Sequence, residues 1–352
     1  MVHNKTKKSP FKFFLIIIIV IMVITVIVDL LSNEQALSIP GNVGILDLSS
    51  CQNYLAALTK DNQVYLWDWK ALSGDPDKRG ICVYPAVILD PERIMYYDSD
   101  TNNALMVKHL ATDDNLAEFP LSSDCRLIHI GATRDRNILA VLLKHISKNN
   151  DDLSNVYQLA TIHPETNRYR TIVNIGSEAM DYQLYFCTIS DNGEWGIMLG
   201  SRQGQGVITV IDVAQRKIAR EINIPGVKLF DHADFEPAGA WFFAGGNNMV
   251  LYQIQTDTGQ IISHIPVDDN FVGAASRTAF RDIAVSPDGK MVAALTTTYK
   301  GGVWDCVSGE NLSKSIFLKK VAATVAFSPD SRLLATGPLQ DGGQISIIRL
   351  PK

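Results

Sequence analysis

The sequence lacks the short motifs that mark most catalytic and metal sites. It has no CxxC pair, no HExxH helix, no GxSxG elbow, no Walker loop and no GxGxxG fingerprint. Its five cysteines are widely spaced and odd in number, which is not typical of a disulfide framework. We therefore predict that the protein is not an enzyme and has no catalytic residues, no metal site and no bound cofactor.

A clustered positive charge is also missing from most of the chain. The 32 Lys and Arg residues are outnumbered by 37 Asp and Glu residues, which gives a formal net charge of -5. Binding to nucleic acid needs a basic face that neutralises phosphates. We expect no nucleic-acid partner, and the one dense group of lysines, at the N-terminus, has a different explanation.

A long apolar run follows these lysines. Between Phe13 and Val28 only Thr25 is not strongly apolar. A helix of about 20 apolar residues crosses the roughly 30 Å hydrocarbon core of a bilayer. The pattern predicts a basic tail over residues 1–12 and a transmembrane signal-anchor helix over residues 13–31.

The charges on the two sides of this run predict its orientation. Lysines precede it, whereas Asp29 and Glu34 follow it. The positive-inside rule then keeps the N-terminus in the cytoplasm and places the rest of the chain outside, in the periplasm or at the cell surface if the host is bacterial. One alternative is a cleaved signal peptide, but its apolar region is shorter, about 7–15 residues, and ends in a small-x-small site that is not evident here. The other is a buried core helix, against which the missing polar face and the preceding lysines argue.

The rest of the chain repeats one sequence pattern. Ile283–Leu295 and Val325–Thr336 each read as an apolar strand, a Ser-Pro-Asp turn and a second apolar strand, which is the pattern of a β-hairpin. Weaker copies occur at Leu48–Ala56, Leu89–Tyr97, Ala132–Ala140, Ile189–Ile197 and Phe235–Phe243. The seven turns are spaced by about 40–58 residues, which brackets the period of a four-stranded propeller blade.

Two further segments end in a Trp-Asp pair, at Trp67 and at Trp304. With the hairpin period, they make residues 35–352 resemble the WD-repeat family. The resemblance implies an all-β fold, a seven-bladed β-propeller of four-stranded blades. The single transmembrane α-helix predicted from the apolar run precedes it.

The resemblance also implies a hydrogen-bond network inside some blades. In the family, a Ser or Thr, an Asp and the Trp share such a network. The matching residues are Thr59, Asp61 and Trp67 in the first blade, with Trp304 and Asp305 in a later one. The Gly-His pair of the family is missing from every blade, so the repeats are degenerate.

The ends of the repeat array predict how the ring closes. The last unit shows only three strands. Ala36–Gly41 resembles Glu221–Gly226, which occupies the place of a fourth strand. We expect a strand near residues 35–39 to complete the last blade and remove an exposed edge.

The densest polar group is Asp231, His232 and Asp234, near the start of a first strand. Such a position can face the central channel, where these side chains could serve as a metal or acid-base site. The simpler interpretation is that His232 belongs to the surface or to a structural network.

The sequence leaves two main functions open, beside a third in which the N-terminal helix itself pairs with partner helices, although it lacks a small-xxx-small motif. The first is a membrane-anchored, extracytoplasmic scaffold whose partners are proteins, in addition to the lipid bilayer. The second is an extracytoplasmic propeller enzyme or small-ligand binder that uses the central channel. Three or more His, Asp or Glu side chains converging in the channel from different blades would favour the second. An apolar or aromatic patch on one face would favour the first.

Overall fold

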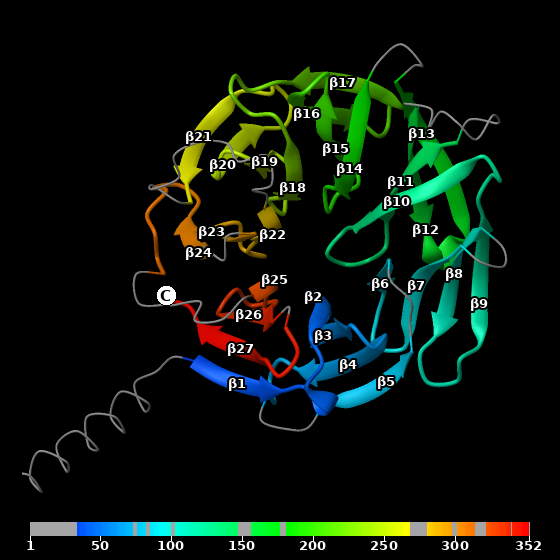
Figure 1. The fold of residues 1–352 in the computed structure, drawn as a ribbon, viewed down its shortest axis with the longest axis vertical. Helices are drawn as coiled ribbons and strands as arrows, with labels where there is room; N and C mark the ends of the chain where they lie inside the picture. Colours follow the sequence, from blue (N-terminus) through cyan, green and yellow to red (C-terminus); the bar gives the residue numbers. More distant parts are fainter. Residues whose placement is uncertain are drawn as a thin grey trace, which may run out of the picture. The chain divides into compact units, whose positions relative to one another are not determined.

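Seven small antiparallel sheets are arranged like blades around a central axis, along which Figure 1 is viewed. The predicted all-β fold, a seven-bladed β-propeller, is confirmed. The computed structural model describes residues 34–72, 76–81, 85–99, 103–146, 156–176, 181–267, 280–297, 301–313, 322–338 and 340–351. Ala36–Lys352 forms one unit by its internal contacts.

In each sheet the strands follow one another outward, and the first strands of neighbouring blades contact one another near the axis. From inside to outside, blade 1 consists of β2 (Ile45–Cys51), β3 (Tyr54–Thr59), β4 (Gln63–Asp68) and β5 (Asp77–Ile81), and blade 2 of β6 (Ala86–Ile88), β7 (Arg93–Asp98), β8 (Ala104–His109) and β9 (Asn115–Pro120). Blade 3 consists of β10 (Cys125–Ala132), β11 (Leu139–His145), β12 (Tyr157–His163) and β13 (Arg168–Ile175). Blade 4 consists of β14 (Tyr182–Ile189), β15 (Trp195–Arg202), β16 (Gln205–Asp212) and β17 (Lys217–Ile222).

The last three sheets continue this order around the ring. Blade 5 consists of β18 (Phe230–Phe235), β19 (Trp241–Gly246), β20 (Val250–Gln255) and β21 (Ile261–Pro266). Blade 6 consists of β22 (Phe280–Val285), β23 (Met291–Thr296) and β24 (Gly301–Asp305). Blade 7 consists of β25 (Ala322–Phe327), β26 (Leu333–Pro338), β27 (Gln344–Arg349) and β1 (Glu34–Ser38). The sixth sheet has three strands within the described residues. Two short 3₁₀ turns, η1 (Pro40–Asn42) and η2 (Pro164–Thr166), lie between strands.

The seventh sheet takes its outermost strand from the start of the domain. Strand β1 is hydrogen-bonded to β27, so the last blade contains the first strand of the chain. Leu37 and Ile39 are buried in one cluster with Leu55 of the first blade and Ile347 of the last. Burial of these two side chains joins the two ends of the array.

The Ser-Pro-Asp turns owe their shape to a hydroxyl group. Ser286 donates a hydrogen bond to Asp288 (2.7 Å) and accepts one from the backbone N–H of Met291 (2.9 Å). Ser328 does the same with Asp330 (2.7 Å) and Leu333 (2.9 Å). The same arrangement in degenerate copies uses Thr133 with Asp135 and Ser190 with Asn192. These side chains satisfy turn groups that β-strand pairing leaves free.

Most innermost strands carry a β-bulge near their start. The register against the second strand shifts by one residue just before Asp47, His129, Phe186, His232, Asp282 and Thr324. A bulge bends a strand and changes the direction of the side chain that follows. All six residues that follow a bulge line the central channel.

The predicted helix over residues 13–31 and the tail before it lie outside the described residues. Within the described part of the chain, no helix has both the length and the apolar character that a bilayer span requires.

Candidate functional site in the central channel

The central channel holds a cavity of about 530 Å³. It is lined by residues from the innermost strand of every blade and from the turns that follow several of them. Ligand pockets commonly have volumes of about 300–1,000 Å³. Since seven blades contribute to its wall, the cavity can gather side chains that are far apart in the sequence.

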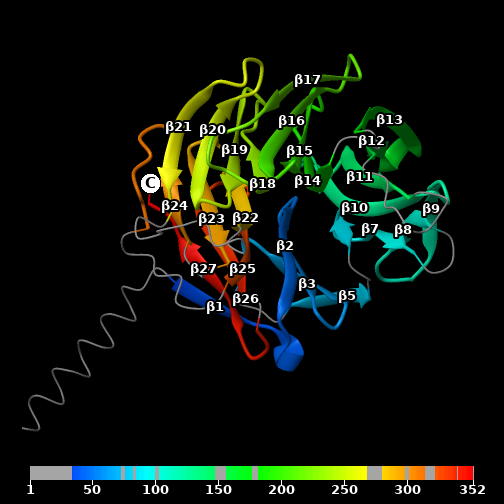
Figure 2. The same ribbon diagram turned by 45° about the horizontal axis from the view of Figure 1, so that its top comes forward.

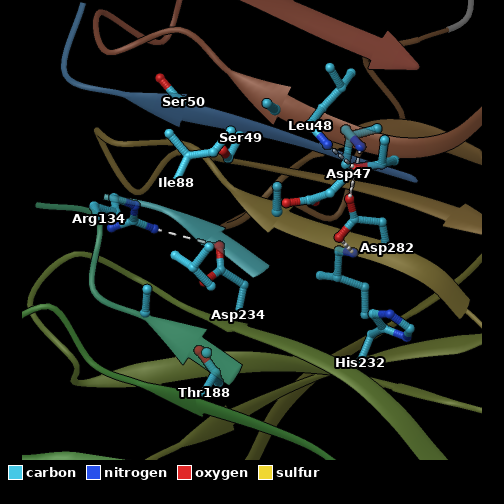
Figure 3. Close-up of a pocket in the computed structure, with 18 of the residues that line it drawn as sticks. Asp47, Leu48, Ser49, Ser50, Ile88, Arg134, Thr188, His232, Asp234 and Asp282 are labelled. Carbon is cyan, nitrogen blue, oxygen red and sulfur yellow. Dashed lines mark hydrogen bonds and ion pairs between the residues drawn. The ribbon is translucent and has the colours of Figure 1, made fainter. Parts of the chain in front are cut away.

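The six residues that follow the bulges form a ring in this cavity, which we call the channel ring. The rings of His129 and Phe186 have centroids 4.4 Å apart, and those of Phe186 and His232 are 5.1 Å apart. Thr324 donates a hydrogen bond of 2.8 Å to Asp282 Oδ2. Figure 3 shows Asp282 between Asp47 and His232. Acidic and imidazole groups from blades 1, 3, 5 and 6 therefore converge, which meets the condition set above for the channel hypothesis.

Some of these side chains also pin neighbouring blades together. Asp282 Oδ2 accepts a hydrogen bond from the N–H of Val325 in the next blade (2.8 Å). Thr324 accepts one from the N–H of Leu48 (3.2 Å), and His129 Nδ1 accepts one from the N–H of Cys187 (3.3 Å). The channel ring therefore has a structural role, because it satisfies backbone groups at the blade interfaces.

The electrostatic state of the ring follows from burial and from like charges. Burial, with the charge of Asp282, raises the pKa of Asp47 to about 7, and Arg136 opposes this shift. Burial also raises the pKa of Asp282, although His232 and backbone N–H groups oppose it. Two buried carboxyl groups that interact share their protons rather than ionise independently. At neutral pH this pair holds less than its full negative charge.

The two histidines of the ring differ. Burial and the nearby His232 lower the pKa of His129 to about 3, so His129 is neutral at pH 7. Burial alone would lower the pKa of His232, but Asp231 and Asp282 outweigh it and raise that pKa above its usual value. A carboxyl pair and a histidine prone to protonation therefore lie on one side of the cavity.

Arg134 lines the cavity and follows the end of the innermost strand of the third blade. Its Nη1 lies 2.6 Å from Asp191 Oδ2, and its Nη2 donates to the carbonyl oxygens of Phe235 (2.8 Å) and Val285 (3.2 Å). Its Nη2 is 3.7 Å from Asp234 Oδ2 (Figure 3). Burial raises the pKa of Asp234 to about 6, while Arg134 holds it down. A residue of the third blade thus spans to the fourth, fifth and sixth.

The predicted group Asp231, His232 and Asp234 is divided by the structure. His232 and Asp234 line the cavity. Asp231 is not among the residues that line it. It lies just before the residue that the bulge redirects, and its carboxylate accepts a hydrogen bond from the N–H of Phe280 (3.1 Å) in the next blade. The strand alternation of side chains explains the difference.

The family-like network of the first blade is incomplete. Thr59 donates a hydrogen bond to Asp61. Trp67 does not complete the network, because its buried Nε1 has no hydrogen-bond partner among the described residues. Trp304, in β24 of the sixth blade, is buried in a cluster with residues of the fifth, and Asp305 accepts hydrogen bonds from the N–H groups of Val307 (3.0 Å) and Ser308 (2.7 Å). All five residues therefore have packing or turn roles.

The sequence analysis missed Asp47 and Asp282, the carboxylates of the channel ring, although a signal was present. Asp47, His129, His232 and Asp282 each stand two positions after an apolar residue at the start of a strand, namely Ile45, Leu127, Phe230 and Phe280. The bulge separates the members of each pair, so that the apolar residue faces the core and the polar residue the channel. The repeated spacing, rather than the local density of polar residues, marks the ring.

Comparisons with known proteins give no family. No family model matches the chain, and no curated protein is similar enough to count as a match. The functional argument therefore rests on the fold and on the channel.

Proposed function

We propose that this chain is a membrane-anchored binding protein whose propeller lies on the extracytoplasmic side and binds a small organic cation in its central channel. The observation that carries the proposal is the convergence of Asp47, His232 and Asp282 from three blades. No bond-breaking step is part of the proposal, in keeping with the absence of catalytic motifs in the sequence.

The class of ligand follows from the carboxyl pair. Burial and the charge of Asp282 make ionisation of Asp47 unfavourable, which raises its pKa. A cationic group held between them would remove that cost and let both ionise. Phe186, half-buried in the same ring, offers an apolar surface next to the charged one. A ligand with an ammonium group on a small ring matches both features.

The membrane anchor is supported by the apolar run over residues 13–31 and by the lysines before it. We expect the full-length chain to stay in the membrane pellet after extraction with alkaline carbonate. Protease added outside sealed cells or spheroplasts should digest the propeller and spare the N-terminal tail. Recovery of a soluble chain that begins after residue 31 would show a cleaved signal peptide, and protection of the propeller would contradict the orientation.

Benzylammonium should bind the purified full-length chain in detergent, and benzyl alcohol, its neutral counterpart, should bind much more weakly. Binding requires the ionised carboxyl pair, and the pKa of Asp47 is about 7. Affinity should therefore fall as the pH is lowered through 7, by up to about tenfold per unit for one competing proton. Calorimetric titration between pH 5 and pH 8.5 measures this dependence.

Asp47→Asn should weaken both the preference for the cation and the fall in its affinity as the pH is lowered through 7. Asp113→Asn is the matched control, because its carboxylate is exposed on an outer hairpin away from the channel. Equal affinity for the cation and the alcohol, or an unchanged affinity in Asp47→Asn, would exclude the channel as a cation site.

A protein-binding scaffold is the second candidate, because several outermost strands expose apolar side chains. Leu116 of β9, Ile218 of β17, and Ile261 and Ile262 of β21 are 37–51% exposed. If proteins co-purify with the chain from detergent-solubilised membranes and Ile262→Asp releases them, this outer edge rather than the channel is the binding surface.

A further inference from the structure

A second cluster of ligand-type side chains lies away from the channel, at the start of β10 and the end of β11. Cys125 and His145 are directly opposite each other in the antiparallel pair, and Asp124 comes just before the strand. Their donor atoms all lie within 4.8 Å of one another. None of the three residues lines the channel cavity. We propose that Asp124, Cys125 and His145 form a zinc(II) site.

The distances between donor atoms fit one tetrahedral ion. Cys125 Sγ is 3.5 Å from His145 Nδ1 and 3.8 Å from Asp124 Oδ1, and His145 Nδ1 is 3.7 Å from Asp124 Oδ2. Zinc bonds of about 2.3 Å to sulfur and about 2.0–2.1 Å to nitrogen or oxygen require ligand separations of about 3.5, 3.5 and 3.3 Å. The Cys125–His145 separation equals its tetrahedral value, and the two distances to Asp124, each to a different carboxylate oxygen, exceed theirs by about 0.3–0.4 Å. The strand pairing already places the three side chains beside one another.

The donor set also suits zinc rather than magnesium or calcium. Thiolate and imidazole are ligands that zinc prefers, and zinc also accepts a carboxylate oxygen, whereas the hard cations take oxygen ligands. The fourth tetrahedral position would be taken by water. Three protein ligands and a solvent position are typical of a zinc ion that can bind a further ligand.

The surroundings hold the three donors in place. The backbone N–H of Ile146 donates to the carbonyl of Asp124 at 2.6 Å, which fixes the two strand ends together. The Ser122 hydroxyl donates to the Asp124 carboxylate and orients it. Such outer contacts commonly direct metal ligands. The pairing across two strands explains why sequence spacing gave no sign of the site.

Metal binding must displace a proton from the thiol. Burial, together with the Asp124 carboxylate, raises the pKa of Cys125 to about 11, so the thiol is protonated without metal. The step is Cys125–SH + Zn²⁺ → Cys125–S–Zn⁺ + H⁺, with the imidazole and carboxylate donating lone pairs. One proton is released for each zinc bound near neutral pH.

The site is tested with the full-length chain in detergent, freed of metal by a chelator and without a histidine tag. Zinc titration against a chromophoric chelator should give one ion per chain. Cobalt(II) should give a thiolate-to-metal charge-transfer band in the near ultraviolet, which reports the sulfur ligand directly. Cys125→Ser should remove that band and weaken zinc binding at least about 100-fold, and His145→Gln should weaken it similarly.

Cys306→Ala is the matched control, because Cys306 is also a buried thiol but belongs to the sixth blade. It should leave the stoichiometry and the cobalt band unchanged. Circular dichroism in excess chelator verifies that each variant is folded, and His145→Gln replaces Cys125→Ser if the latter is not. No zinc bound by the wild-type chain at micromolar free zinc, or binding that survives both ligand substitutions, would overturn the proposal.

Discussion

Deletion of Gln35–Pro40 is expected to lower the free energy of unfolding of the propeller by about 3–6 kcal/mol. The deletion removes most of β1, the outermost strand of the last blade. Leu37 and Ile39, which are 4% and 3% exposed, would be lost from the cluster that joins the first and last blades. Full burial of one such aliphatic side chain contributes about 1.5–3 kcal/mol. With a typical domain stability of about 5–15 kcal/mol, the effect is large.

Two point variants show whether the loss of stability comes from the buried side chains that close the ring or from shortening the chain. Leu37→Ala should cost about 2–4 kcal/mol, because its side chain is buried against both blades. Ser38→Ala is the matched control in the same strand, since Ser38 is exposed on the opposite face. Chemical denaturation of the full-length chain in detergent measures all three. A denaturation midpoint unchanged by the deletion would show that β1 is not needed to close the ring.

The fold could be predicted because its strongest local signals are turns. Ser286 and Ser328 with their following Pro-Asp pairs set two hairpins firmly, and the period then located the weaker ones. The hydroxyl of Thr133 fills the role of those serines in a turn without proline, which is why degenerate copies still fold alike. Trp67 was harder to interpret, because its burial preserves the packing but not the hydrogen bond of the family.

The candidate site could be predicted only in part, because bulges decide it. The local density of polar residues pointed to His232 and Asp234, which line the cavity. It pointed equally to Asp231, whose carboxylate instead binds a backbone N–H of the next blade. A bulge shifts by one residue which side chains of the strand face the channel, and no single residue type predicts where a bulge occurs. Asp47 and Asp282 are separated by 235 positions and become neighbours only when the ring closes. Such a pair is a product of topology.

Arg134→Ala is expected to lower the free energy of unfolding by about 2–4 kcal/mol. The substitution removes a partly buried ion pair with Asp191 and two hydrogen bonds to backbone carbonyl groups. The guanidinium contacts three other blades through Asp191, Phe235 and Val285. Its loss leaves the carboxylates of Asp191 and Asp234 without their nearest cation. Arg134→Lys should recover only part of the loss, because an ammonium cannot reproduce the fork of contacts.

The cost of Arg134→Ala should also grow with pH. The pKa of Asp234, about 6 with Arg134 present, should rise further without it. A raised carboxyl pKa gives stability that is complete below the unfolded value and is lost as the pH passes the folded value. The variant should therefore lie closer to wild type at pH 5 than at pH 8 in urea denaturation. Arg332→Ala is the matched control, because its contact with Asp330 is long (3.9 Å) and exposed, and it should cost less than about 0.5 kcal/mol. Equal costs for the two variants would show that Arg134 does not join the blades.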